Sequence, residues 1–250
     1  MSEPAAFGRA ARAQATMETR LTARRGENLL AMIGLPAAAL VFFGLVGVPA
    51  GRDPAVLLPA VLSLAILASG LVNLGIATAY ERGNGVLKRL GGSPLGREGL
   101  LVAKVAVVAA ITLVQVAALV ALAWAALGWR PGPEGSVIGL VVAVAVTTLI
   151  GATAFAGLGL LIAGSVRPEA ALVLANTLFL VALMVGGVLV PVRDLPEPLA
   201  SLAALLPVGA LAEAYGVSLG SGGSLATNLG IVVAWGLGAL AVARRTFRWE

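Results

Sequence analysis

Long apolar runs alternate with short polar segments along the whole chain. Six runs reach the roughly 20 mostly apolar residues that a membrane-spanning helix needs. They lack the strict alternation of apolar and polar positions that membrane β-barrel strands show, so the pattern predicts helices. The predicted spans cover about residues 29–48, 54–79, 100–127, 136–165, 170–190 and 225–243.

Two further segments flank this pattern. In residues 1–27, Ala13, Met17 and Leu21 recur at helical spacing, with arginines on another face. This spacing predicts an amphipathic helix on the inner membrane surface, and a solvated basic tail is the alternative. The predicted six-helix domain follows residues 1–27 and covers about residues 28–243, and a short predicted cytoplasmic tail covers residues 244–250.

The second segment, at about 191–224, is apolar but is interrupted by four prolines. It predicts two short helices, at about 199–206 and 207–219, that enter the outer leaflet and return. Such a re-entrant segment is stable where surrounding protein satisfies its backbone. The glycines and serines of residues 220–224 predict a flexible turn before the last span.

Composition agrees with a membrane environment. Hydrophobic residues make up 59% of the chain and charged residues 12%, against about 25% charged in soluble domains. The chain has no cysteine and no histidine, which excludes disulfides, the usual zinc sites and a Ser-His-Asp triad. Because it has neither residue, the chain is not expected to bind a metal. The dipeptide Gly-Lys never occurs, so the chain has no P-loop of its own and is not expected to bind ATP.

Basic residues are distributed unevenly between the predicted loops. Of the 17 lysines and arginines, only Arg52, Arg130 and Arg193 lie in one set of alternate loops, and the other 14 lie in the opposite set and the two terminal segments. The positive-inside rule then places both termini in the cytoplasm. Because this rule explains the basic charge, no nucleic-acid partner is expected.

Residues 80–104 form the longest polar stretch and contain both lysines. Within it, residues 81–90 predict a short helix at the membrane surface, with an apolar side and a basic side. Gly91 and Gly92 end this helix, and Ser93 with Pro94 has the pattern of a new helix N-terminus. Anchoring to anionic lipid is the alternative role for such a segment.

Polar side chains inside the predicted spans are few. They are candidates for a translocation path, and hydrogen bonding between helices is the alternative. The clearest are Asn73, Thr78, Gln115, Asn176 and Thr177. Glu213 is an acid in the apolar outer segment, and it either reaches the outer interface or contributes to an outer gate or substrate handling.

Two motifs resemble those of type-2 ABC exporter permeases. In the first, the family has Glu-Arg, a Gly-x-Leu-(Lys/Glu)-Arg-Leu run, Ser/Thr-Pro-Leu and a lysine entering the next span. The second is the outer segment before the last span, matched here by Leu195, Pro196, Pro207 and Glu213. The matching positions of the first motif are Glu81, Arg82, Gly85, Leu87, Lys88, Arg89, Leu90, Ser93, Pro94, Leu95 and Lys104.

The resemblance implies that the short polar helix is a coupling helix, at about 81–92, which sits in a cleft of a separate ATPase subunit. It also implies two P-loop ATPases, which carry the ATP and Mg, and a second permease copy or a sister permease. The residues that would couple to the ATPase are Glu81, Arg82, Gly85, Leu87, Lys88, Arg89 and Leu90.

The expected function is export of a small apolar or amphipathic compound, such as a drug or antibiotic, across a bacterial plasma membrane. Export of a lipid or glycan is the alternative within the family. A secondary carrier is disfavoured because the six predicted spans contain no Asp or Glu. A membrane scaffold that transports nothing is a third alternative.

Overall fold

The computed structural model describes residues 30–47, 53–91, 96–131, 136–186, 190 and 192–246, and these residues form helices and connections without a β-strand. The prediction of an all-α membrane protein is thereby confirmed. The amphipathic helix predicted within residues 1–27 and the last residues of the predicted C-terminal tail lie outside the described residues.

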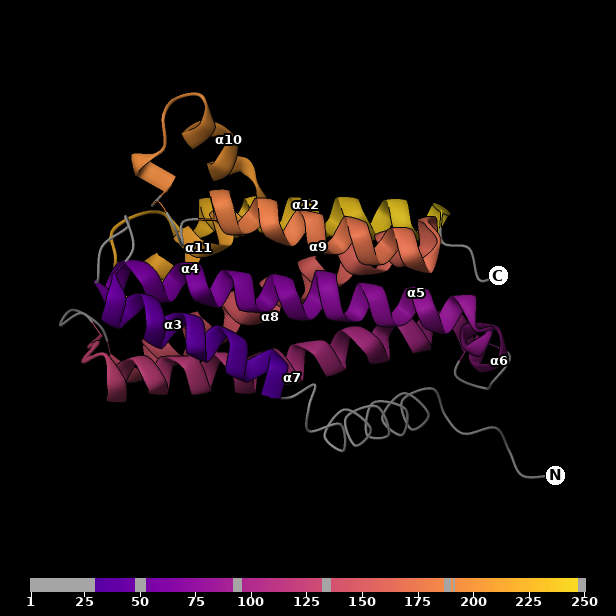
Figure 1. Ribbon diagram of the computed structural model, residues 1–250, viewed down its shortest axis with the longest axis horizontal. Helices are drawn as coiled ribbons and strands as arrows, with labels where there is room; N and C mark the ends of the chain where they lie inside the picture. The colour runs from indigo at the N-terminus through magenta and orange to yellow at the C-terminus, as the bar shows by residue number, and fades with distance from the viewer. Residues whose placement is uncertain are drawn as a thin grey trace.

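The helices run back and forth along the long axis of the molecule (Figure 1). Most are α-helices, two segments are π-helical (η1 and η2) and one is a 3₁₀ turn (η3). Their bounds are η1 Leu30–Gly34, α3 Leu35–Val46, α4 Pro54–Leu67, η2 Ala68–Leu74, α5 Gly75–Gly83, α6 Val86–Gly91, α7 Gly96–Ala126, α8 Val137–Ser165, α9 Pro168–Val185, η3 Val192–Asp194, α10 Leu199–Leu205, α11 Pro207–Ser218 and α12 Leu225–Thr246.

Five helical stretches in the described part of the chain are long and apolar enough to cross a membrane. They agree with the second to sixth predicted spans and are Pro54–Gly83, Glu98–Ala126, Val137–Ser165, Pro168–Val185 and Leu225–Thr246. The first predicted span is shorter. Its η1 and α3 segments, of 5 and 12 residues, together reach only the lower limit of the roughly 17–25 residues that a span requires.

The continuous stretch of α4, η2 and α5 lies at the centre of the bundle. Every residue of α4 from Leu57 to Leu67 is buried, and α8 packs along both η2 and α5. By contrast, α9 and α12 bury only a narrow set of positions. Their outward side chains are mainly apolar, as expected for helices that face lipid or another membrane subunit.

Glycines allow the central helices to approach closely. A Cβ atom at Gly159 of α8 would lie 2.3 Å from the carbonyl oxygen of Gly70 in η2, and a Cβ at Gly75 would lie 3.1 Å from the Gly159 backbone. Small residues at such crossings let membrane helices pack backbone against backbone. The contact therefore fixes α8 against the middle of the central stretch.

The two ends of the bundle carry different structures (Figure 1). The short helix α6 lies at one end, and α10 projects from the opposite end. Helices α10 and α11 are bent by 78° at the break before Pro207, and α11 then returns into the bundle, where it contacts α4, α8 and α12. The predicted pair of short helices, broken at Pro207, is present.

Candidate functional site

The α5–α6 hairpin is formed by residues 75–91 and turns at Asn84 and Gly85. Asn84 N donates to the Tyr80 carbonyl at 2.9 Å, and Gly85 N donates to the Arg82 carbonyl at 2.9 Å. Gly85 has φ of 71°, a left-handed conformation that glycine adopts at no steric cost. The turn separates α6 from the long central helix and lets it lie across the end of the bundle.

This turn changes the boundaries expected from the sequence. One short helix was predicted over residues 81–90. In the structure, Glu81 and Arg82 belong to the last turn of α5, which ends at Gly83. Only Val86–Gly91 forms the separate helix α6. The physical reason is the position of the turn, since Gly85 is the glycine in this segment that takes a positive φ among the described residues.

Glu81 joins the end of α5 to α7. Its Oε2 lies 2.7 Å from Nζ of Lys104, and Lys104 is 4% exposed. A buried ammonium group requires an opposite charge close by, because water no longer stabilises it. The Glu81–Lys104 pair therefore holds the base of the hairpin against the first third of α7.

Arg82 joins the same end of α5 to α8. The side chain is buried, Nη1 donates to the Gly164 carbonyl at 2.8 Å and Nη2 donates to the Val166 carbonyl. Gly164 lies in the last turn of α8, where carbonyls have no partner within the helix, and Val166 directly follows the helix. A cation at a helix C-terminus is also favoured by the helix dipole. Arg82 thus caps α8 from the neighbouring helix.

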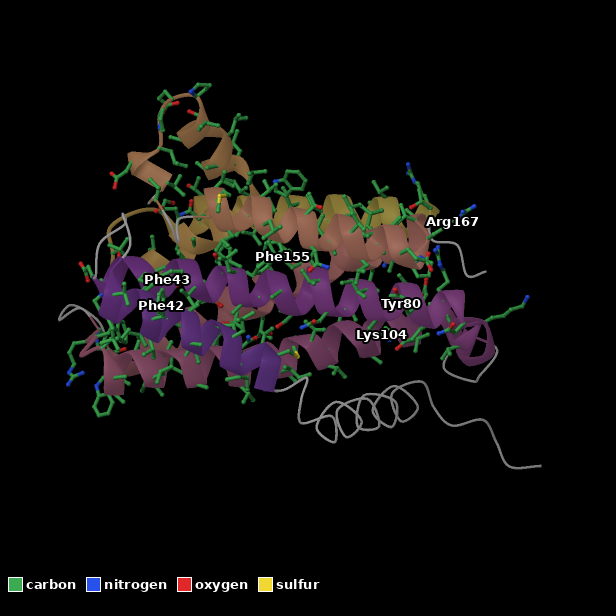
Figure 2. The ribbon with its side chains drawn as sticks, in the orientation of Figure 1. Phe42, Phe43, Tyr80, Lys104, Phe155 and Arg167 are labelled. Atoms are coloured by element: carbon green, nitrogen blue, oxygen red, sulfur yellow. The ribbon has the colours of Figure 1, made fainter. Side chains whose placement is uncertain are left out.

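The remaining residues of the first motif take different positions. Leu87 is wholly buried and seats α6, which contacts both α5 and α7. Lys88 is exposed on α6. Tyr80 and Lys104 lie on neighbouring helices near this end, and Arg167 lies there too (Figure 2). The side chains of Arg89 and Leu90 fall outside the described residues, as do residues 92–95.

The polar residues of the spans divide into two groups. Gln115 belongs to an internal network: Ser69 Oγ donates to its Oε1 at 3.0 Å, and its Nε2 donates to the Met32 carbonyl at 2.5 Å. This network joins η1, η2 and α7. Thr78 is also wholly buried, and its Oγ1 has no hydrogen-bond partner among the described residues.

The second group is exposed on the outside of the chain. Asn73 lies on η2, and Asn176 and Thr177 lie on α9, which contacts η2 and α5. Asn176 Nδ2 donates to the Leu172 carbonyl of its own helix at 2.8 Å. Glu213 is exposed on α11, a helix that is otherwise mostly buried. The structure therefore brings these four side chains to the surface of the single chain.

Residues 12–218 match the family model of ABC-2 type transporters, and the match takes in the hairpin, five of the predicted spans and α11. The chain belongs to the ABC-2 type transporter family. No curated protein matches the sequence. An ABC-2 domain is the membrane-spanning permease of an ABC transporter and is distinct from its ATPase.

This ABC-2 permease contains a polar cluster that the sequence reading did not single out. We call Thr147 and Thr148 of α8 and Tyr215 and Ser218 of α11 the hydroxyl cluster. Thr147 Oγ1 lies 2.9 Å from Ser218 Oγ, and Thr148 Oγ1 lies 2.8 Å from Tyr215 OH. All four residues are buried. The adjacent threonines within an apolar run were a signal that could have been used.

The permease has no group of three or more His, Cys, Asp and Glu residues that could hold a metal in the part of the chain that the structure describes. An open apolar groove of about 260 Å³ lies between α8 and α12. Thr153 is the polar side chain in that lining, and it donates to the Leu149 carbonyl of its own helix.

Proposed function

We propose that the chain is the permease of an ATP-driven exporter and that α6 is its coupling helix. In this proposal α6 docks in a cleft of a P-loop ATPase subunit, and two ATPases with Mg and ATP drive two permeases. The cargo is a small apolar or amphipathic compound such as a drug or antibiotic. The membrane is a bacterial plasma membrane, and the α6 end faces the cytoplasm with both termini.

The observation that carries the proposal is the geometry of the α5–α6 hairpin. A six-residue helix stands at the end of the bundle between two spans, presents the exposed Lys88 and is seated by the buried Leu87. Such a helix has little reason to exist in a chain that only anchors to lipid. Because it is fixed to the bundle on its inner side, a partner that moves it also moves the helices behind it.

The exposed polar residues support a path between two permeases. Asn73, Asn176 and Thr177 lie in the middle of apolar helices, and a side-chain amide facing lipid loses hydrogen bonds to water without replacement. A second copy or a sister permease, with a path between them, would give these groups polar partners. Gln115 already has partners inside the chain, which favours a packing role for it.

The scarcity of acidic residues supports an apolar cargo and an external energy source. Proton- and ion-coupled carriers hold their ion on acidic groups inside the spans. The acids of the described helices lie near their ends or on α11: Glu81, Glu98, Glu169, Asp194 and Glu213. ATP-dependent uptake of a hydrophobic dye into inverted vesicles, in the absence of an ion gradient, would separate the exporter from a carrier.

The decisive experiment is co-purification of the ATPase with charge-reversal variants in mild detergent. We expect the parent chain to bring down a stoichiometric P-loop ATPase, and Lys88→Glu to lower its recovery by about tenfold, equivalent to about 1.4 kcal/mol of binding. Arg167→Glu is the matched control, since it reverses an exposed charge at the same end that lies on the connection between α8 and α9 and not on α6.

Equal losses in the two variants would show a general effect of charge, and the coupling assignment of α6 would be wrong. A parent chain that brings down no ATPase would instead favour the carrier or the scaffold. A scaffold also predicts that the turnover of a bound ATPase is indifferent to this chain.

A further inference from the structure

Helix α8 is one of the unbroken helices that touch both ends of the bundle. It runs for 29 residues without proline, or about 43 Å at 1.5 Å per residue. The central stretch of α4, η2 and α5 has the same direction, but seven of its residues form the π-helix η2. A π-helical segment has weaker backbone geometry and is a common site of local rearrangement.

At the α6 end, two neighbouring residues of the hairpin contact the end of α8 and the start of α9. Arg82 donates to the Gly164 carbonyl in the last turn of α8 and to the carbonyl of Val166, the residue that follows the helix. The next residue, Gly83, lies against the side chain of Pro168 at the start of α9, where a Cβ would be 2.8 Å from Pro168 Cγ. Charge-assisted hydrogen bonds of this kind are about twice as strong as neutral ones.

Toward the opposite end, about a third of the way along α8 from Val137, α8 is bound to α11 through the hydroxyl cluster. Thr148 donates its proton to the Val144 carbonyl, so Tyr215 OH must donate to Thr148. Ser218 donates its proton to the Ala214 carbonyl, so Thr147 must donate to Ser218. The two bonds therefore run in opposite directions between the helices, and each hydroxyl proton is used once.

We propose that α8 transmits the displacement of α6 to the re-entrant helix α11, with Arg82 at the C-terminal end of α8 and the hydroxyl cluster in its first half as the positioning residues. The proposal rests on α6 being the coupling helix, as proposed above. In this arrangement Arg82 acts inside the permease and does not contact the ATPase. Motion of the ATPase pulls the hairpin, α8 follows as one body, and α11 changes its position at the far end.

The absence of cysteine in the chain allows a single label to report on α11. Leu202 of α10 is 58% exposed, and α10 packs against α11. A Leu202→Cys variant carrying an environment-sensitive fluorophore would be assembled with its ATPase in nanodiscs. Emission would be compared without nucleotide and with Mg-ATP trapped by vanadate. This measurement needs no knowledge of the transported compound.

Matched substitutions would then be added to the labelled chain. Arg82→Gln removes the bonds at the end of α8. Its control, Arg167→Gln, removes an exposed guanidinium from the residue next to Val166, whose carbonyl Arg82 binds. Thr148→Val removes the bond to Tyr215 together with a bond to its own helix. Thr153→Val removes only a bond to its own helix. Thr148→Ser keeps the hydroxyl and serves as the rescue.

We expect Arg82→Gln and Thr148→Val each to reduce the nucleotide-dependent change in emission by about threefold or more, within the range of coupling effects along packed networks. The two control variants and Thr148→Ser should keep the parent response. The two contacts act in series along one route. The double variant Arg82→Gln, Thr148→Val should therefore lose no more of the emission change than the more impaired of the two single variants. If Arg82→Gln does not assemble, the threonine series alone decides.

A parent-like response in Thr148→Val would overturn the inference and direct attention to the route through α5, η2 and α4, since α4 also contacts α11. An equal loss in Thr153→Val would overturn it as well. A parent complex that binds its ATPase without any response at Leu202 would refute the transmission while leaving the proposed function intact. A parent chain that binds no ATPase would refute the proposed function itself.

Discussion

The charged residues of the first motif make different contacts in this permease because some are shielded from water and others are exposed. Glu81 and Arg82 are adjacent in sequence, yet Glu81 pairs with Lys104 of α7 and Arg82 caps α8. Lys88, one turn beyond the bend, is exposed. A charged residue that is shielded from water must be compensated inside the protein, whereas an exposed one keeps its hydration. The motif thus combines internal fixation with a candidate docking residue.

The Glu81–Lys104 pair predicts a large loss of stability when only one partner is removed. Glu81→Gln leaves the ammonium of Lys104 buried without its counter-charge, since Lys104 is 4% exposed. We expect a loss of about 1–3 kcal/mol, below the roughly 3–5 kcal/mol of fully buried pairs, because Glu81 is about a third exposed. Thermal unfolding in detergent, monitored by circular dichroism, would measure it.

A double variant tests whether the charge is the cause. Glu81→Gln with Lys104→Met removes both partners and keeps the side-chain volumes similar, so it should recover most of the loss. Glu98→Gln is the control, because Glu98 is an exposed acid at the start of the same helix α7. A double variant that is less stable than Glu81→Gln alone would show that the pair contributes mainly through packing.

At the scale of single elements, the sequence predicted the re-entrant pair well because proline marks a break chemically. Pro207 cannot donate a backbone hydrogen bond, and the 78° bend lies beside it.

The sequence placed the α5–α6 hairpin less accurately. Several glycines near residue 85 could have formed the turn, and periodicity does not choose between them. Whether Thr147 and Thr148 meet hydroxyl groups depends on the rotation of α11, which its sequence alone does not fix.

The crossing of α8 with the central stretch predicts a strict need for glycine at residue 159. In Gly159→Ala the new Cβ would lie 2.3 Å from the Gly70 carbonyl oxygen, and a backbone atom cannot move aside as a flexible side chain can. We expect a loss of about 1–3 kcal/mol, the usual cost of overpacking. The midpoint of thermal unfolding in detergent and the yield of folded protein would measure it.

Gly238→Ala supplies the matched control for that crossing. A Cβ at Gly238 of α12 meets nothing within 4 Å, so the substitution should be neutral or stabilise the helix by up to about 1 kcal/mol. Equal destabilisation by the two substitutions would mean that the crossing tolerates a methyl group, and α8 would not be fixed against η2 as described.

At the scale of the whole molecule, the fold gathers basic residues at the end that carries α6. Lys88, Arg167 and the pair Arg244 and Arg245 at the end of α12 lie there, whereas Arg130 lies at the opposite end, over Trp124. Under the positive-inside rule, we expect such a bundle to have its α6 end in the cytoplasm. The same orientation is required if α6 is to meet an ATPase that uses cytoplasmic ATP.

Single cysteines in this cysteine-free chain would test that orientation directly. Asn84→Cys lies at the exposed turn of the hairpin, and Gly222→Cys lies in the exposed segment before α12, where a side chain meets nothing within 4 Å. A membrane-impermeant maleimide applied to intact cells should label Gly222→Cys, and should label Asn84→Cys only after permeabilisation. The reverse pattern would place α6 outside the cell, away from ATP, and the coupling assignment could not stand. Labelling of both positions from outside would mean that the spans do not alternate as the helices of the bundle require.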